Sequence, residues 1–466
     1  MTSTIAVPVW LALLVALLAA WAALDRLLVP SVRWLLRQRV NRALEEANRR
    51  LQIRLPPFKL TKRRVLIDRL VYDPEVVRKV EETAAAEGVP RQVLVERVER
   101  YANEIVPSFN AYIYFRFGYW LSRRIARALY RVRLGARDED ALASIDPEAT
   151  VVFVMNHRSN MDYVLVAYLV AERAALSYAV GEWARIWPLE QLIRSMGAYF
   201  VRRRSRNDLY RLVLARYVAM ATREGLTQAV YPEGGLSRDG RLQPPKLGLL
   251  DYMLREFDRK CRDVVFVPVG INYDRVLEDR TLLLDGRPGA ERKGALRALA
   301  TTFGFLSHNL LLLLRGRWFR FGYACVNFGL PLSTRDFLAA RGVDLGALPK
   351  EERFERVGEL AGELMGRVQR AIPALPVALV STLFHRQPDR RFSELELKAA
   401  AQELIGELER GGSRVYVPRR SRDYAIQVGL RMLVLRHLVV QEEGLYRARP
   451  EERALIAYYA HSVARP

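Results

Sequence analysis

The chain has 466 residues, half of them hydrophobic, and its 74 Lys and Arg residues against 52 Asp and Glu residues give a net charge of +22. This composition excludes a disordered protein, allows a large core and implies an anionic partner, for which nucleic acid, an anionic membrane leaflet and an acidic carrier protein all qualify. The two cysteines, Cys261 and Cys325, lie far apart without metal-ligand spacing, so we expect neither a disulfide framework nor a metal site.

Residues 1–30 are predicted to form a transmembrane anchor. The stretch from Thr2 to Leu24 has no charged side chain, and about 20 helical residues at ~1.5 Å each span the ~30 Å of a hydrocarbon core. A secretory signal peptide is the rival interpretation, although no Lys or Arg precedes the apolar run. Because arginines follow it, from Arg26 to Arg42, the positive-inside rule predicts a single N-terminal span in the cell membrane with the bulk of the protein on the cytoplasmic side.

Residues 31–135 are predicted to form a helical region. Within it, the stretch from Phe109 to Val132 interleaves aromatic side chains with arginines. This mixture suits a membrane interface, where rings lie at headgroup level and arginine meets lipid phosphate. A helix packed on the protein with a solvated arginine face fits the same pattern, so both interpretations stay open.

Residues 136–335 differ, because short apolar runs alternate with helical patterns. The alternation predicts an α/β domain with a central mixed sheet flanked by helices, and ligands should bind at its strand ends. The expected helices include Asp208–Arg223 and Leu247–Phe257. The expected strands are Val151–Met155, Leu176–Val180, Ala198–Val201, Gln228–Tyr231, Val264–Val269 and Tyr323–Phe328.

Two further segments are predicted to be helical. The uncharged stretch from Ala298 to Leu314 is too short and too polar for a second span, and we interpret it as an interfacial or buried helix. Residues 336–466 form a C-terminal helical region, with helices expected over Ser393–Glu409 and Tyr424–Val440.

Block 1, Val151–Tyr163, delivers a histidine from an apolar strand into a turn, with a carboxylate five residues later. A carboxylate at this reach can hold one imidazole nitrogen and leave the other free to take a proton from a hydroxyl, so His157 and Asp162 are a candidate catalytic pair. The arrangement is a Ser-His-Asp triad without the serine, in which a substrate hydroxyl is the nucleophile. Taken alone, the pattern also fits a histidine that caps or packs a turn.

Three further blocks follow in order. Block 2, Gly197–Arg204, ends a strand in consecutive arginines before a helix N-terminus, which suits a phosphate group. In block 3, Tyr231–Gly248, glycines let backbone approach a ligand while Arg238 and Lys246 add cationic donors. Block 4, Val264–Tyr273, is a strand that enters a turn. Each block by itself also fits a structural role, as a solvated arginine face, a turn or a buried strand.

Together the four blocks resemble the glycerolipid acyltransferase family and are closest to its glycerol-3-phosphate acyltransferases. Block 1 contains His-Arg-Ser-Asn-Met-Asp-Tyr, with the arginine that this branch favours where the lysophosphatidate branch more often has glutamine. Gly-Ala-Tyr-Phe-Val-Arg-Arg in block 2 and Glu-Gly-Gly-Leu-Ser-Arg-Asp-Gly-Arg-Leu in block 3 resemble the same branch. The resemblance is firm over residues 100–331, and softer matches extend to the C-terminus.

The resemblance implies a membrane-bound acyltransferase domain that moves a fatty acyl group from an acyl thioester to the hydroxyl of glycerol-3-phosphate, without a cofactor and without an acyl-enzyme. His157 would be the general base and Asp162 its orienting partner. The implied partners are acyl-CoA or acyl carrier protein as the donor and an anionic phospholipid membrane. The residues implied in substrate binding are Arg202, Arg203, Glu233, Gly234, Arg238, Lys246 and Pro268.

One position departs from the family pattern, because Leu236 stands where the family usually has arginine. Either the neighbouring cations Arg203, Arg204, Arg238 and Lys246 compensate, or the acceptor differs from glycerol-3-phosphate. Pro232 also resembles the lysophosphatidate branch, so lysophosphatidate is the alternative acceptor. The positive charge also allows a nucleic-acid-binding protein, but no nucleic-acid module is legible and we expect no such partner.

Overall fold

The structure, a computed structural model, describes residues 56–285 and 321–463, except for residues 136–137, 171–174, 182–184, 186, 188 and 203–204. The predicted anchor over residues 1–30 and the apolar stretch from Ala298 to Leu314 lie outside the described residues. Within the described part of the chain, no helix combines the length and the apolar character that a membrane span requires.

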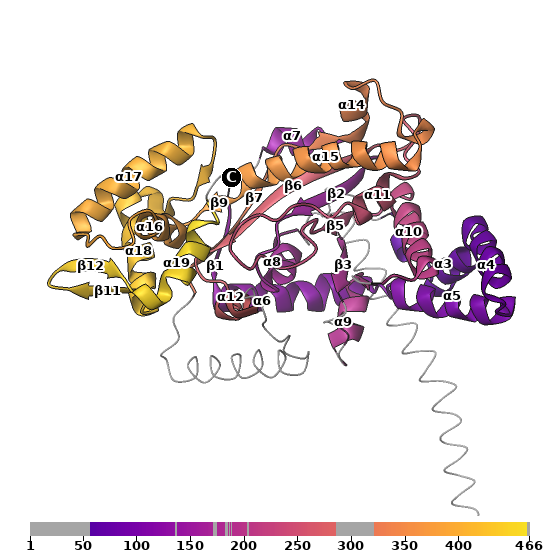
Figure 1. Cartoon of the computed structure of the whole chain (residues 1–466), viewed down its shortest axis with the longest axis horizontal. Coiled ribbons are helices and arrows are strands. Elements are labelled where there is room, and N and C mark those ends of the chain that lie inside the picture. The colour runs from indigo at the N-terminus through magenta and orange to yellow at the C-terminus, as the bar shows by residue number, and fades with distance from the viewer. Residues whose placement is uncertain are drawn as a thin grey trace, which may run out of the picture.

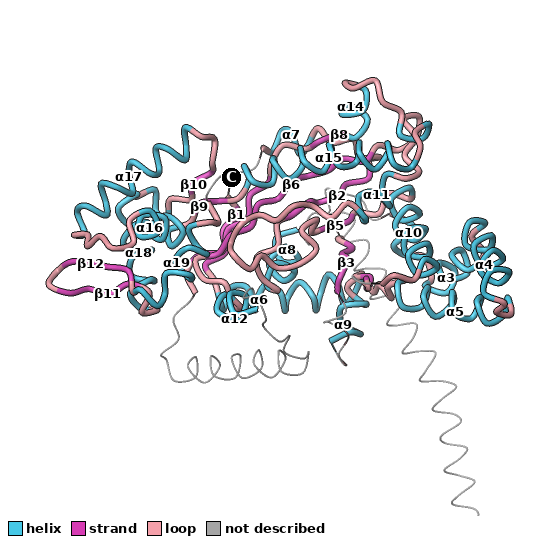
Figure 2. Tube along the Cα trace, in the orientation of Figure 1, coloured by secondary structure: helices cyan, strands magenta, loops and turns pink. Residues whose placement is uncertain are grey.

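The described residues form a mixed central sheet of eight strands, which confirms the predicted α/β class (Figures 1 and 2). The strand order is β1-β7-β6-β2-β5-β3-β4, and β8 also pairs with β6. The strands are β1 (Arg131–Leu134), β2 (Thr150–Met155), β3 (Ser177–Gly181), β4 (Tyr199–Val201), β5 (Gln228–Val230), β6 (Val264–Tyr273), β7 (Tyr323–Phe328) and β8 (Leu332–Ser333). β2 lies between parallel β5 and parallel β6, whereas β7 and β8 pair antiparallel with β6.

Helices cover the sheet and extend the molecule at both ends (Figure 1). The first described helices are α2 (Pro57–Leu60), α3 (Arg63–Val71), α4 (Pro74–Glu87), α5 (Arg91–Ile105), the π-helix η1 (Ile113–Gly118) and α6 (Tyr119–Leu129). Those within the α/β region are α7 (Glu139–Ala143), α8 (Met161–Val170), α9 (Leu189–Ser195), α10 (Asp208–Arg223), α11 (Gly248–Leu254), α12 (Asp279–Asp285), α14 (Thr334–Ala339), the 3-10 turn η3 (Leu345–Ala347) and α15 (Lys350–Ala371).

The C-terminal region combines helices with two small sheets (Figure 2). Its helices are α16 (Pro376–Arg386), α17 (Glu394–Arg410), α18 (Arg422–Leu435) and α19 (Arg453–Ala460), with 3-10 turns η4 (Pro418–Arg420) and η5 (Pro450–Glu452). Its strands are β9 (Pro373–Ala374), β10 (Arg414–Val415), β11 (Val439–Glu442) and β12 (Leu445–Ala448).

Both faces of the sheet are buried, which is why its central strands are continuous apolar runs. In β2, Val151, Phe153 and Met155 join one hydrophobic core, here core 1, while Val152 and Val154 join core 2 on the opposite face. Core 1 contains residues of α8 and of α16 to α19, and core 2 contains residues of α3 to α5, α10, α11 and α15. The C-terminal helices therefore share a core with the sheet.

The structure confirms the six predicted strands, and five of them agree within a residue or two. The sixth, β6, continues beyond the predicted Val269 to Tyr273. α10 has the predicted bounds. Two expectations were wrong. β1 lies inside the region predicted to be helical, because its residues pair with β7 as an edge strand. The helix expected over Tyr424–Val440 ends at Leu435, and β-branched Val439 and Val440 begin a hairpin with β12 instead. The bounds of the four predicted regions stay predictions.

Candidate active site

The carboxyl ends of β2, β5 and β6 lie at one edge of the sheet, because these strands are parallel neighbours. Asn156 extends the pairing beyond β2. Its side chain accepts a hydrogen bond from the backbone nitrogen of Ile271 at 2.7 Å and donates to the carbonyl oxygen of Ile271 at 2.9 Å. The loop that follows β2 is thereby fixed beside the end of β6, at the edge where ligands bind in such folds.

His157 and Asp162 form a buried pair at this edge. Asp162 lies in the first turn of α8, and its Oδ2 is 2.8 Å from Nδ1 of His157. The imidazole is stacked on Tyr231 with ring centroids 4.2 Å apart, and Tyr163 meets it edge-on. Nε2 has no hydrogen bond to a described residue. With Nδ1–H donating to the carboxylate, Nε2 carries the lone pair of a base.

Four donors hold the Asp162 carboxylate. Besides His157, the backbone nitrogens of Arg158 and Ser159 donate to Oδ2 at 2.7 and 3.1 Å. The Tyr273 hydroxyl donates to Oδ1 at 2.7 Å. Burial, and then the nearby carboxylate, raise the pKa of Tyr273 well above its ordinary value, which keeps its proton in place. These four hydrogen bonds fix the orientation of the Asp162 side chain.

Glu233 joins block 3 to block 1. Its Oε1 accepts from the backbone nitrogen of His157 at 2.6 Å, and its Oε2 accepts from that of Gln243 at 2.8 Å. Burial raises the pKa of Glu233 to about 7, although both backbone bonds lower it. The carboxyl group thus fixes the backbone that carries His157. Its predicted contact with the acceptor stays a prediction.

The loop after β6 supports block 1 from the other side. Glu278 accepts hydrogen bonds from the Ser159 hydroxyl at 2.7 Å and from the Asn160 backbone at 3.2 Å, and burial raises its pKa. The adjacent Asp279 accepts from Tyr459 of α19 and from Arg436 after α18. The C-terminal region therefore fixes the loop after β6, and this loop in turn fixes block 1.

Arg158 links block 1 to block 3 and to α19. Its Nη1 donates to the carbonyl oxygen of Gly240, and its guanidinium lies 4.8 Å from the centre of the Tyr458 ring. Gly240 has a φ of 85°, and a Cβ there would lie 1.9 Å from the Tyr458 carbonyl oxygen. Only glycine allows this approach of block 3 to α19.

The predicted phosphate-binding cations differ in their surroundings. The side chains of Arg238 and Lys246 are exposed and have no hydrogen bond or ion pair with a described residue. Lys246 lies across Gly234, where a Cβ would be 3.0 Å from Nζ. Arg202 donates to both carboxylate oxygens of Glu104, at 2.8 and 2.5 Å, so a phosphate there would compete with that carboxylate. Arg203 lies outside the described residues.

Two apolar positions complete the predicted set. Pro268 of β6 pairs with Val154 of β2. On its other side β6 pairs with β8 before Pro268 and with β7 after it, so the proline lies between the two pairings, where its missing N–H is tolerated. Leu236 is half-buried and packs against core 1. Its side chain therefore contacts protein, whereas Arg238 of the same loop is exposed.

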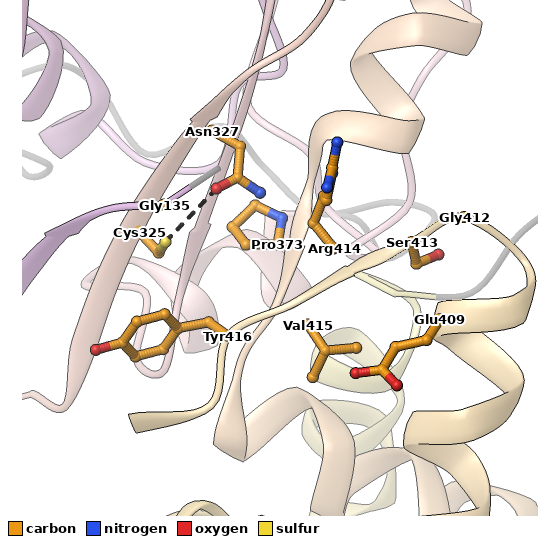
Figure 3. A pocket seen from close by; sticks show the side chains of 10 residues that line it. All are labelled: Gly135, Cys325, Asn327, Pro373, Glu409, Gly412, Ser413, Arg414, Val415 and Tyr416. Atoms are coloured by element: carbon orange, nitrogen blue, oxygen red, sulfur yellow. Dashed lines mark hydrogen bonds between the residues drawn. The ribbon is translucent and has the colours of Figure 1, made fainter. Parts of the chain in front are cut away.

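A cavity of ≈ 580 Å³ lies on the other face of the sheet, between β7 and the β9–β10 pair (Figure 3). Its walls include Cys325 and Asn327, which alternate along β7 with the core 1 residues Ala324 and Val326. His157 stacks on Tyr231 of core 1. This cavity is therefore separated from His157 by the sheet.

Tyr273 and Glu278 are the contacts that sequence reasoning missed. Both follow the apolar part of β6, and polar residues at the carboxyl end of a central strand were the available signal. Among the described residues, no group of three or more His, Cys, Asp or Glu side chains could hold a metal ion.

Comparison with known proteins gives two family matches. Residues 137–272 match the family described as Acyltransferase, and residues 309–463 match the family described as Glycerol-3-phosphate acyltransferase C-terminal region. The first match contains the His157–Asp162 pair, and the second contains α15 to α19.

Curated relatives share the sequence over most of this chain. A protein named glycerol-3-phosphate acyltransferase from Pseudomonas putida (strain KT2440) is 31% identical over 332 residues, which cover 69% of this chain and 38% of the relative. One of the same name from Xanthomonas campestris pv. campestris is 29% identical over 374 residues, covering 78% of this chain and 41% of the relative. The chain thus spans about two fifths of the length of these relatives.

Among solved structures, the 1-acyl-sn-glycerophosphate (LPA) acyltransferase from Thermotoga maritima is 16% identical, with 66% of this chain and 98% of that chain covered. The TM-score is 0.32, so this likeness adds nothing to the fold described above.

Proposed function

We propose that the chain is a glycerol-3-phosphate acyltransferase, which transfers a fatty acyl group from an acyl thioester to a hydroxyl of glycerol-3-phosphate and makes lysophosphatidate. The two family matches and the 31% identity to a relative of that name support this proposal. The observation that carries this proposal is the His157–Asp162 pair, with Nε2 free of described partners at the carboxyl edge of the sheet. The donor is acyl-CoA or acyl carrier protein.

The pair accounts for the chemistry without an acyl-enzyme. His157 Nε2 takes the proton of the acceptor hydroxyl as its oxygen attacks the thioester carbonyl. The tetrahedral intermediate then expels the thiolate, and the imidazolium gives it the proton that came from the acceptor hydroxyl, which leaves a free thiol and a neutral His157. The Asp162 carboxylate stabilises that imidazolium through the bond to Nδ1.

Arg238 and Lys246 support a phosphate-bearing acceptor, because both are exposed cations on the loop that Glu233 ties to His157. Lysophosphatidate is the second candidate acceptor. The observation that favours it is Leu236, an apolar side chain where a phosphate-binding arginine is expected.

We expect Arg238→Ala to raise the KM for glycerol-3-phosphate by about tenfold, because a charge-assisted contact of about 1.5 kcal/mol is lost. Leu236→Arg should change that constant little if the neighbouring cations already bind the phosphate. If lysophosphatidate is the acceptor, Leu236→Arg should shift the preference toward glycerol-3-phosphate.

The measurement is the ratio of kcat/KM for the two acceptors in the wild type, Arg238→Ala and Leu236→Arg, with acyl-CoA and acylated carrier protein as donors in parallel. Leu236→Met serves as the control, since it preserves the packing on core 1. A wild-type preference for lysophosphatidate would overturn the acceptor assignment, and no transfer to either acceptor would overturn the proposed function.

We further propose that the protein acts at the cytoplasmic side of the cell membrane, attached by residues 1–30 and by a surface on η1 and α6. Tyr112, Phe117 and Trp120 are exposed on this surface, between 39% and 51%. The exposed arginines beside them are Arg116, Arg123, Arg124 and Arg127. Exposed rings among cations suit an anionic lipid interface.

Deleting residues 1–30 is expected to leave partial binding to anionic vesicles that high salt removes, since each arginine near an anionic surface contributes about 1 kcal/mol. Adding Arg123→Gln and Arg124→Gln should reduce this binding further. Flotation with anionic and neutral vesicles at two salt concentrations measures it. Arg78→Gln with Arg91→Gln, exposed arginines of α4 and α5, is the control of equal charge change. Equal, salt-insensitive flotation with both lipids would contradict the surface assignment.

A further inference from the structure

A second cavity, of ≈ 450 Å³, opens between α16, α17 and α19 and borders block 3 at Arg241. Its buried lining is mostly apolar and includes Leu404 of α17, Ala460 of α19 and Val463, with Thr382 of α16 as a buried polar residue. Its mouth carries exposed His385 and Arg386 of α16 together with Arg241. The cavity thus has an apolar floor and a cationic rim, a lining unlike that of the cavity in Figure 3.

The rim has more positive than negative charge. His461 donates from Nδ1 to the carbonyl oxygen of Asp239 at 2.9 Å, and its Nε2 faces Nη2 of Arg241 at 3.4 Å. The His385 ring lies 5.1 Å from the His461 ring. Burial, then His461 and Arg241, lower the pKa of His385, which favours its neutral form, so the positive charge of the rim comes from Arg241 and Arg386.

Glu407 is the acidic side chain among the described residues that line the cavity. It is already paired with Arg386, whose Nη1 donates to Oε2 at 3.0 Å. Arg241 therefore has no carboxylate partner from the described lining, and an anion from solution would supply the missing negative charge.

We propose that this cavity binds an amphiphile with one alkyl chain and an anionic head, the chain on the floor formed by α17 and α19 and the head at Arg241 and His385. The volume falls in the range of about 300 to 1,000 Å³ typical of sites for single small ligands, and such sites combine apolar walls with a few polar groups. Only the source of this ligand rests on the proposed function, because lysophosphatidate, its product, has one alkyl chain and an anionic head.

The position gives the site a direct link to block 3. Arg241 follows Gly240, which contacts Tyr458 of α19, and it lies three residues after Arg238. A head group held by Arg241 is therefore bound beside the loop that carries the predicted acceptor cations. Product leaving that loop would meet this cavity as a neighbouring site.

Photolabelling tests the site directly. The probe is dodecyl phosphate with a photoreactive group on its chain, applied to the 466-residue chain with His157→Ala so that catalysis plays no part. We expect labelled peptides from α17 and α19, and an excess of unlabelled dodecyl phosphate should suppress the label. A probe with the same chain and a neutral maltoside head should label these peptides at least fivefold less. Equal labelling by the two probes, or labelling elsewhere alone, overturns the proposal.

Two exposed ion pairs on α17 provide matched variants. Arg386→Gln frees the Glu407 carboxylate at the rim, and we expect it to weaken dodecyl phosphate binding about fivefold, the upper range for an exposed charge pair. Arg422→Gln frees Glu409 in the same way, at the same 3.0 Å separation, but outside this cavity, and it should leave binding unchanged. Equal effects of the two variants would show a nonspecific response to charge.

The outcomes separate this site from the proposed acyl transfer. If wild-type protein transfers no acyl group but α17 and α19 are labelled with the expected head-group preference, the proposed function fails and the binding site stands. If acyl transfer is measured but the labelling shows no preference for the anionic head, the proposed function stands and the binding site fails. Leu408→Trp, which fills the cavity from a half-buried position on α17, should abolish the label without changing the charge.

Discussion

Replacing His157 with alanine is expected to lower kcat by about 10² to 10⁴, the usual loss when a positioned general base is removed. The reason is local, because Nε2 of His157 is the ring nitrogen left free when Nδ1 is bound to Asp162. The fold should persist, since Asp162 keeps its bonds from the Arg158 and Ser159 backbone and from Tyr273. Steady-state kinetics with purified protein in detergent measure the loss, and a thermal unfolding scan checks the fold.

The matched control is His437→Asn. His437 is exposed in the loop after α18 with a φ of 56°, a conformation that asparagine tolerates well. This variant should retain wild-type turnover. A His157→Ala protein with more than a tenth of wild-type activity would remove His157 from the role of general base.

The strands of the α/β region were predictable because burial on both faces makes them short, continuous apolar runs. β2 and β7 show this most clearly, since nearly all their residues are buried. α10 was predictable to the residue because Asn207 caps it with a bond to the Tyr210 backbone and Gly225 follows its last turn. Local chemistry determines both kinds of element.

The elements that were missed depend on distant parts of the chain. β1 has exposed arginines and becomes a strand by pairing with β7, almost two hundred residues later. The β11–β12 hairpin is short, and its neighbour is Phe392 before α17. The hydrophobic periodicity of a segment carries no information about a pairing partner elsewhere in the sequence, so these strands could not be predicted from local pattern.

The same distinction applies to the candidate site. His157 and Asp162 are five residues apart, so one turn and the start of α8 bring them together. Tyr273 reaches Asp162 across 111 positions, and Glu104 reaches Arg202 across 98. The pair that does the proposed chemistry was therefore legible in the sequence. Tyr273, which orients Asp162, and Glu104, which would compete with a phosphate for Arg202, could not be predicted, because their contacts depend on how distant segments pack.

Asp162→Asn is expected to lower kcat by about 10², through loss of charge more than loss of orientation. The backbone nitrogens of Arg158 and Ser159 both donate to Oδ2, so the asparagine oxygen must occupy that position. The amide nitrogen then faces the Tyr273 hydroxyl, which can rotate to accept its hydrogen bond. His157 would keep the same tautomer, and only the stabilisation of its imidazolium by a carboxylate would be lost.

Tyr273→Phe provides the complementary test of orientation. It keeps the carboxylate but leaves Oδ1 buried without the Tyr273 donor, and we expect kcat to fall about three- to tenfold with KM unchanged, since a lost buried hydrogen bond costs about 1 kcal/mol or somewhat more. In the Asp162→Asn background, Tyr273→Phe removes the hydroxyl that would accept a hydrogen bond from the asparagine amide. The two losses should then not add in a double-mutant cycle measured on kcat. Asp162→Asn with turnover close to wild type would show that the carboxylate charge plays no part in the reaction, and strictly additive losses would show that Tyr273 does not act through Asp162.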